Sequence, residues 1–184
     1  MSDIKRREDL NKTAGTEADF STRLRDRLGA KFRPNAISCI LADISGSMGG
    51  EPIRKLRELM DGLDSNRRFI FDSAAEELKP GQKIPEPRGT TNMTDAFKLL
   101  KKEGINHVVM ITDGSPDNKQ TALEESDGLR IDIFYVGAGE ATDFLKDLAH
   151  KTGGKFGQRN LKDHLQLQTE ISGLLEPPKS TIAL

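Results

Sequence analysis

The sequence predicts an α/β domain with a doubly wound, mostly parallel central sheet and helices on both of its faces. From Asn35 onward, apolar runs of strand length alternate with segments of helical periodicity. The runs are continuously apolar, which is typical of parallel strands buried on both faces. Strands separated by helices pair in parallel through right-handed crossovers. The length of 184 residues, with 35 % hydrophobic residues, predicts one such domain.

The elements are expected in the following order. The predicted strands are 36–42, 69–71, a short one near 77–79, 107–111, 131–136 and one opening at 155–156. Helical stripes are formed by Ile53, Leu56, Leu59, Met60 and Leu63, by Met93, Ala96, Phe97 and Leu100, and by Leu145, Leu148, Ala149 and Thr152. The helix 142–152 is expected to end at Gly153-Gly154, and a last helix spans 161–176. The connection 73–93 is long, which is typical of a functional loop.

The chain divides into an N-terminal polar segment with an amphipathic helix (1–34), the α/β domain (35–176) and a C-terminal tail (177–184). Within 16–33, four apolar residues recur every fourth position: Phe20, Leu24, Leu28 and Phe32. Such a stripe predicts a helix that packs on its own sheet edge or docks a partner in a multi-protein assembly.

Composition excludes several classes of protein. The 28 Lys and Arg against 29 Asp and Glu argue against a nucleic-acid binder, which would be strongly basic. No run approaches the roughly 18 apolar residues of a membrane span, and the charged N-terminus has no secretory signal, so we expect a cytoplasmic protein. Cys39 is the single cysteine and is expected to be an inert core thiol. The scattered His107, His150 and His164 are expected on exposed faces, with no role in metal binding.

Oxygen-bearing side chains cluster at the expected carboxyl ends of strands, where ligands bind in this fold class. Asp43-Ile44-Ser45-Gly46-Ser47 follows the first strand, Gly89-Thr90-Thr91-Asn92 precedes a helix, and Thr112-Asp113-Gly114 ends the strand 107–111. Carboxylates and hydroxyls without His or Cys select a hard cation, Mg²⁺ first and Mn²⁺ or Ca²⁺ next.

The spacing of the first motif suits one ion. Side chains at alternate positions of an extended segment point the same way, so Asp43, Ser45 and Ser47 can converge if glycines let the chain curl. Most of these ligands are neutral hydroxyls and few are carboxylates, so they neutralise little of the charge of the ion, which stays electrophilic. The expected sixth ligand is therefore an Asp or Glu of a protein partner.

These three motifs, in this order, resemble the von Willebrand factor type A family, whose metal-ion-dependent adhesion site uses this pattern. The likeness extends through Val136-Gly137-Ala138-Gly139 and Thr152-Gly153-Gly154-Lys155-Phe156, covering about 35–176. It implies a doubly wound sheet with the metal site at its top, and protein binding rather than catalysis.

The resemblance also assigns the metal ligands. It implies Asp43, Ser45, Ser47, Thr91 and Asp113, with the serines and in some members the threonine touching the metal directly and the aspartates acting partly through water. Thr91 is preferred to Thr90 because the family's threonine lies five residues before a helix alanine, here Ala96.

Three other functions fit parts of the sequence. A scaffold or assembly subunit would bind through its N-terminal segment and keep only a structural or vestigial metal site. A serine hydrolase would use Ser47 as nucleophile, Asp113 as acid and His150 as base, although Ser45 replaces the first glycine of the nucleophile elbow. A phosphoryl-transfer enzyme with Asp43 as nucleophile would want a second acid where Ser45 stands.

Overall fold

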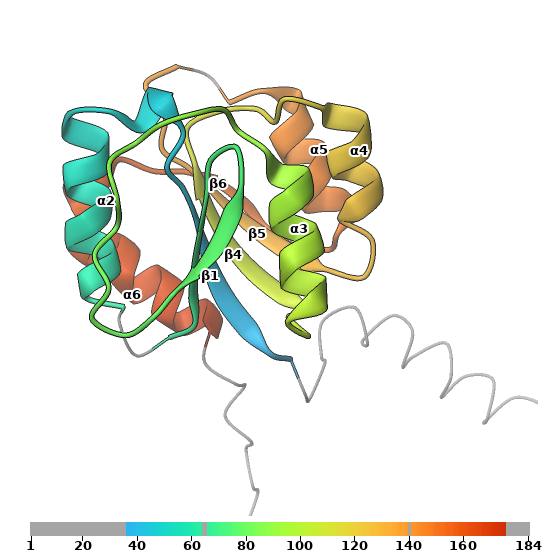
Figure 1. Ribbon diagram of the computed structural model, residues 1–184, viewed down its shortest axis with the longest axis horizontal. Helices are drawn as coiled ribbons and strands as arrows, with labels where there is room; N and C mark the ends of the chain where they lie inside the picture. Colours follow the sequence, from blue (N-terminus) through green and yellow to red (C-terminus); the bar gives the residue numbers. More distant parts are fainter. Residues whose placement is uncertain (1–35, 64–65, 140, 176–184) are drawn as a thin grey trace, which may run out of the picture. The chain divides into compact units, whose positions relative to one another are not determined.

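Six strands form one sheet in the computed structural model, which describes residues 36–63, 66–139 and 141–175. The sheet order is β3-β2-β1-β4-β5-β6 (Figure 1). All neighbours pair in parallel except β2 and β3, which are antiparallel. The strands are β1 Ser38–Asp43, β2 Arg68–Phe71, β3 Ala75–Leu78, β4 His107–Thr112, β5 Arg130–Tyr135 and β6 Phe156–Gln158.

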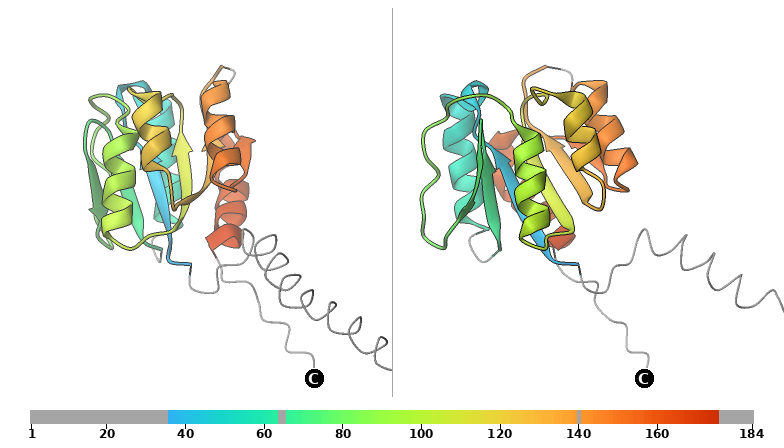
Figure 2. Two further views of the ribbon diagram at one scale, coloured as in Figure 1. Left: turned by 90° about the vertical axis from the view of Figure 1, so that its right-hand side faces the viewer. Right: turned by 45° about the vertical axis from the view of Figure 1, so that its right-hand side comes forward.

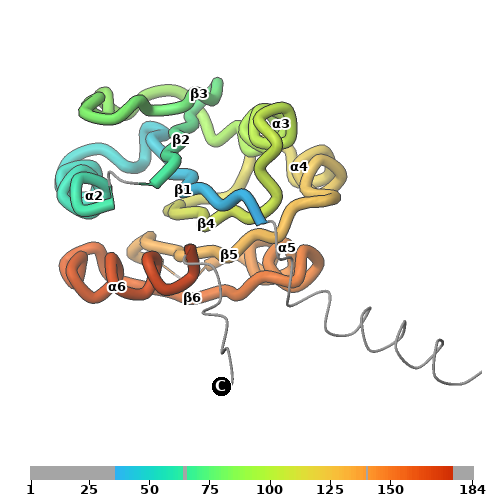
Figure 3. Tube along the Cα trace, turned by 90° about the horizontal axis from the view of Figure 1, so that it is seen from below, coloured from blue at the N-terminus to red at the C-terminus, as the bar shows by residue number. Residues whose placement is uncertain are grey.

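The helices cover both faces of this sheet. They are the 3₁₀ turn η1 Gly46–Met48, α2 Glu51–Asp61, α3 Met93–Lys102, α4 Lys119–Glu125, α5 Asp143–Lys151, the 3₁₀ turn η2 Leu161–Asp163 and α6 His164–Leu175. Figure 3 shows α2 and α6 on one side of the sheet and α3, α4 and α5 on the other. The predicted doubly wound α/β fold is confirmed.

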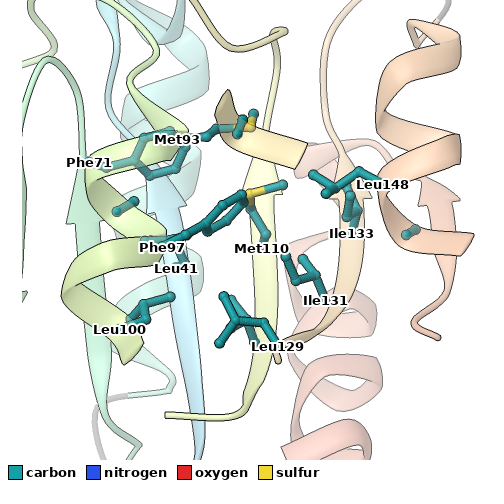
Figure 4. Close-up of a cluster of buried hydrophobic side chains, with 14 of the residues drawn as sticks. Leu41, Phe71, Met93, Phe97, Leu100, Met110, Leu129, Ile131, Ile133 and Leu148 are labelled. Atoms are coloured by element: carbon teal, nitrogen blue, oxygen red, sulfur yellow. The ribbon is translucent and has the colours of Figure 1, made fainter. Parts of the chain in front are cut away.

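Side chains of each central strand alternate between two cores. In β1, Cys39 and Leu41 pack toward α3 and α5, whereas Ile40 and Ala42 pack toward α2 and α6. Figure 4 shows the first core, where Phe97 of α3 lies among strand side chains such as Leu41 and Met110. Both faces of these strands are buried, which is why their sequences read as unbroken apolar runs.

Most of the predicted elements are present. The residues of the first two helical stripes are all buried, as are Leu145, Leu148 and Ala149 of the third. The short strand expected near 77–79 is β3, whose antiparallel direction the sequence did not indicate. Helix α4 was not predicted at all. The last helix begins with η2 and continues as α6. The N-terminal segment 1–34, including the helix expected within 16–33, and the tail 177–184 lie outside the described residues.

Among the helices of the described ranges, none combines the length and hydropathy that crossing a bilayer requires. Cys39 is fully buried, and burial raises the pKa of its thiol well above the ordinary value, so the predicted inert core thiol is confirmed.

The expectation that His107 lies on an exposed face is wrong. Its side chain is buried at the start of β4, where Nε2 lies 2.7 Å from Asp132 Oδ2 and Nδ1 lies 3.0 Å from Ser38 Oγ. The physical reason is the place of β4 between β1 and β5, which puts a hydrogen-bonding side chain on each side of the ring. His150 is exposed on α5 as predicted, and His164 is half-buried on α6.

Asp132 is expected to stabilise the fold in a pH-dependent way. Burial acts to raise its pKa, but the His107 hydrogen bond, the Arg130 charge 3.3 Å away and the Lys155 N–H together lower it below the ordinary value of 3.8. Because folding lowers this pKa, the ionised Asp132 stabilises the folded state at pH values above the ordinary pKa of an aspartate. That stabilisation is lost as the pH falls through the pKa of Asp132 in the folded state.

Asp132→Asn should therefore lower the free energy of unfolding by about 2 kcal/mol at pH 7. The difference from wild type should shrink as the pH falls below about 4. Urea unfolding at several pH values measures both effects, and Asp147→Asn, an exposed change on α5, is the matched control. An equal loss at pH 7 and pH 3.5 would contradict this account.

Candidate metal centre

Asp43 joins the ends of the two central strands. It is the last residue of β1 and has no exposed surface. Its Oδ1 accepts the backbone N–H of Ser45 at 2.8 Å, and its Oδ2 accepts the hydroxyl of Thr112, the last residue of β4, at 2.6 Å. The carboxylate therefore holds the loop after β1 against the end of β4.

Three further oxygen-bearing side chains meet at this point. Ser45 Oγ lies 3.2 Å from Ser47 Oγ, and Ser47 donates its hydroxyl hydrogen to Asp113 Oδ1 at 2.7 Å. The turn η1 produces this convergence, because Met48 N–H bonds back to Ser45 O at 3.0 Å and the Met48 side chain is fully buried. Figure 1 shows η1 and the connection after β4 at the same end of the sheet.

Thr91 reaches the same rim from the long connection before α3. Its Oγ1 would lie 3.8 Å from a Cβ built on Gly114, which places the hydroxyl beside the turn that contains Asp113. Thr90 instead donates its hydroxyl to Asp117 Oδ2 at 2.5 Å. The two threonines thus have different surroundings, because the Thr90 hydroxyl is held by Asp117 and the Thr91 hydroxyl lies beside the turn that contains Asp113.

Two residues that support the site were not predicted to do so. Thr112 donates to Asp43, as described above, and it belongs to the motif that carries Asp113. Asp117 accepts the Thr91 backbone N–H at 3.2 Å as well as the Thr90 hydroxyl, and so holds the threonine loop against the loop after β4. Asp117 belongs to no recognisable motif, so nothing in the sequence pointed to this role.

The electrostatics of the site favour a bound cation. The pKa of Asp43 is raised to about 6: burial and, to a smaller extent, the nearby Asp113 raise it, while hydrogen bonds from Ser45 and Thr112 lower it. Within the described ranges no three His, Cys, Asp or Glu side chains gather as a potential metal site. The donors here are two carboxylates and three hydroxyls, a set that fits a hard divalent cation such as Mg²⁺.

The serine hydrolase alternative lacks its base. Ser47 directs its hydroxyl to Asp113, and His150 is exposed in the last turn of α5. No hydrogen bond links His150 to Ser47 or Asp113 in the described part of the chain. The triad of Ser47, Asp113 and His150 that this alternative requires is therefore not assembled among the described residues.

A groove of about 590 Å³ opens beside these oxygens. Ser47 and Asp113 line it, together with side chains from the start of α2, the loop after β5 and the segment between β6 and α6. Figure 2 shows the connection from β5 to α5 at the same end of the sheet as η1. A partner segment that reaches the candidate metal centre thus has a groove beside it.

Comparison with known proteins agrees with this architecture. A von Willebrand factor type A protein from Catenulispora acidiphila superposes with a TM-score of 0.62 at 17 % identity, over 74 % of this chain and 42 % of that one. The chain has the von Willebrand factor type A fold. This likeness concerns the fold alone, because the sequence identity is low.

A curated relative adds sequence similarity over a shorter stretch. The thrombospondin-related anonymous protein of Plasmodium falciparum is 36 % identical over an alignment of 85 residues, and the match covers 38 % of this chain and 15 % of the relative. The chain thus spans a small part of that relative and less than half of the solved structure. No family model matches the chain.

Proposed function

We propose that this chain is a protein-interaction module that binds a divalent cation, Mg²⁺ first, through Asp43, Ser45, Ser47, Thr91 and Asp113. The cation in turn binds an Asp or Glu side chain of a partner protein. The module works by binding and carries out no chemical conversion.

One observation carries the proposal. The hydroxyls of Ser45 and Ser47 and the carboxylate of Asp113, which come from two different loops, form a chain of contacts of 3.2 and 2.7 Å. A helix cap or an isolated turn, the ordinary uses of Ser and Asp in loops, would not bring these loops together. The von Willebrand factor type A fold supports the same use of the site.

The residues of this chain have distinct parts in the proposal. Asp43 holds the loop after β1 in place through Ser45 N–H and Thr112, so the serine hydroxyls need little reorganisation on binding. Asp113 supplies negative charge, and Ser45, Ser47 and Thr91 supply neutral oxygens. A cation bound among them would keep much of its charge and supply a strong electrostatic attraction for an incoming carboxylate.

Titration calorimetry with Mg²⁺ and Mn²⁺ tests the metal site. Wild type should bind one ion, and Ser47→Ala should weaken binding at least tenfold because it removes a donor. Ser115→Ala is the matched control, since Ser115 is a nearby half-buried serine whose hydroxyl lies 2.8 Å from that of Thr142. Identical titrations for wild type and Ser47→Ala, or no binding to wild type, would reject the proposal.

A pull-down with the whole 184-residue chain tests whether a partner binds through the metal. Partners captured in Mg²⁺ should be released by EDTA and should not be captured by Ser47→Ala. Deletion of residues 1–34 tests the scaffold alternative in the same assay, because a scaffold that binds through this segment would lose its partners on deletion and keep them in EDTA.

A further inference from the structure

The groove beside the candidate metal centre is lined by more basic than acidic side chains. Three lining residues are cationic and two are anionic: Lys55, Arg159 and Lys162, against Glu51 and Asp113. If Asp113 contributes to holding a cation, the balance over the rest of the groove is positive. The groove would therefore attract a partner segment that extends along it from the metal and carries negative charge.

Two of the three cations are already engaged. Lys55 Nζ lies 2.7 Å from Glu58 Oε2, and Arg159 Nε donates to Glu170 Oε2 at 2.8 Å. The Arg159 guanidinium also lies 5.7 Å from the centre of the Phe134 ring. These contacts hold both side chains in the wall of the groove and neutralise part of their charge.

Lys162 differs from both. It is exposed, and its ammonium forms no hydrogen bond or ion pair with any residue that the structure describes. The backbone around it is well held, because Asn160 Oδ1 accepts the Lys162 backbone N–H at 2.9 Å and the neighbouring Leu161 side chain is buried. The segment thus presents an unpaired positive charge from a fixed position in the groove.

We propose that the partner segment carries two acidic side chains, the first for the metal and the second for Lys162. This inference rests on the proposed function and adds the chemistry of the partner: an extended acidic peptide rather than a lone carboxylate. Pro52, Val136 and Ala138 also line the groove and offer small apolar contacts for the chain between the two acids.

Synthetic peptides measure the effect of the second acid. Each has one Asp followed by a second Asp after one, two or three glycines, and a matched peptide has Asn in the second place. Each added residue moves the second carboxylate by about 3.3 Å, so the set covers a range of positions along the groove. Binding is followed by NMR titration of the full chain in 10 mM Mg²⁺ at low salt.

With wild type, the best diacid peptide should bind about threefold to fivefold more tightly than its Asn partner, as expected for an exposed ion pair. Lys162→Glu should abolish this preference and leave the affinity for the single-acid peptide nearly unchanged. Lys102→Glu, the same charge change at the exposed C-terminal end of α3, should keep the preference. High salt should reduce it, because exposed charges are screened.

The outcomes separate this inference from the proposed function. Equal binding of diacid and single-acid peptides to wild type, or a preference that survives Lys162→Glu, overturns the inference alone. Glutarate that competes as well as the best peptide would assign the groove to a small dicarboxylate and also overturn it. If single-acid peptides bind equally well in Mg²⁺ and in EDTA, both the proposed function and this inference are rejected.

Discussion

Replacing Asp43 by asparagine should stabilise the metal-free protein and abolish its stabilisation by Mg²⁺. Burial raises the pKa of Asp43 from the ordinary 3.8 to about 6, which means that the folded state disfavours the charged form. At about 1.36 kcal/mol per pKa unit, the cost at neutral pH is roughly 3 kcal/mol. We therefore expect Asp43→Asn to raise the free energy of unfolding by about 1–3 kcal/mol at pH 7.5 in EDTA.

Asparagine can keep the local hydrogen bonds. Its Oδ1 still accepts the Ser45 N–H, and its amide can donate to Thr112 Oγ1. Thr112 can then direct its own hydroxyl hydrogen to Gly114 O, which already lies 3.2 Å away. The substitution therefore removes a buried charge while the Ser45 N–H and the Thr112 hydroxyl both keep hydrogen-bond partners.

The sign of the pH dependence follows from the raised pKa. The cost of the Asp43 charge is absent below about pH 4 and develops as the pH rises through about 6, so the advantage of Asp43→Asn should grow over this range. Mg²⁺ at ten times its Kd should stabilise wild type by about 1.4 kcal/mol and should not stabilise the variant.

Chemical unfolding at pH 5 and 7.5, in EDTA and in Mg²⁺, measures all of these effects. Asp143→Asn is the control, because Asp143 is an exposed carboxylate in the first turn of α5. A metal-free variant that is less stable than wild type at pH 7.5 would contradict the account of buried charge. A variant still stabilised by Mg²⁺ would contradict the assignment of Asp43 to the metal site.

Gly154→Ala should be among the most destabilising substitutions in the domain. A Cβ at Gly154 would lie 1.8 Å from the backbone oxygen of Ile131 and 2.9 Å from the backbone nitrogen of Asp132. These are main-chain atoms of β5, so the clash cannot be relieved by rotating a side chain. The segment leading into β6 would have to move away from β5, at an expected cost of at least about 3 kcal/mol.

Gly173→Ala, the same chemical change at another position, is expected to stabilise the protein. Gly173 is exposed on α6, and a Cβ there would meet nothing within 4 Å. Alanine should stabilise the helix by about 0.5–1 kcal/mol. Urea unfolding of both variants checks the pair, and a loss below 1 kcal/mol for Gly154→Ala would show that β6 accommodates the methyl group.

The sequence predicted those features that depend on neighbouring residues or on regular spacing. The unbroken apolar runs indicated β1, β4 and β5, and the stripes of α2 and α3 matched the buried residues. Helix α4 was missed because Ala122 is its single buried residue within the described chain, so it carries no apolar stripe. Gly153 and Gly154 were both expected to end α5, whereas only Gly153 has a positive φ, of 72°, and Gly154 is required by its contact with β5.

Contacts between distant residues account for what the sequence did not reveal. His107 is buried because Asp132, 25 positions later, lies beside it across β4 and β5. Asp117 holds the threonine loop through a contact across 26 positions. The five candidate ligands were predicted because each follows or precedes a regular element, but the unpaired charge of Lys162 became visible only with the groove.

The division between strand ends and loops also bears on how such a protein can evolve. Asp43 and Thr112 end buried strands and bond to each other, so a substitution that loses this hydrogen bond would loosen the rim. The groove walls, by contrast, are built from exposed turns such as 136–138 and 158–162. Descendants of one ancestral gene can therefore exchange one interaction for another through mutations in these turns, while the rim formed by the strand ends is inherited unchanged.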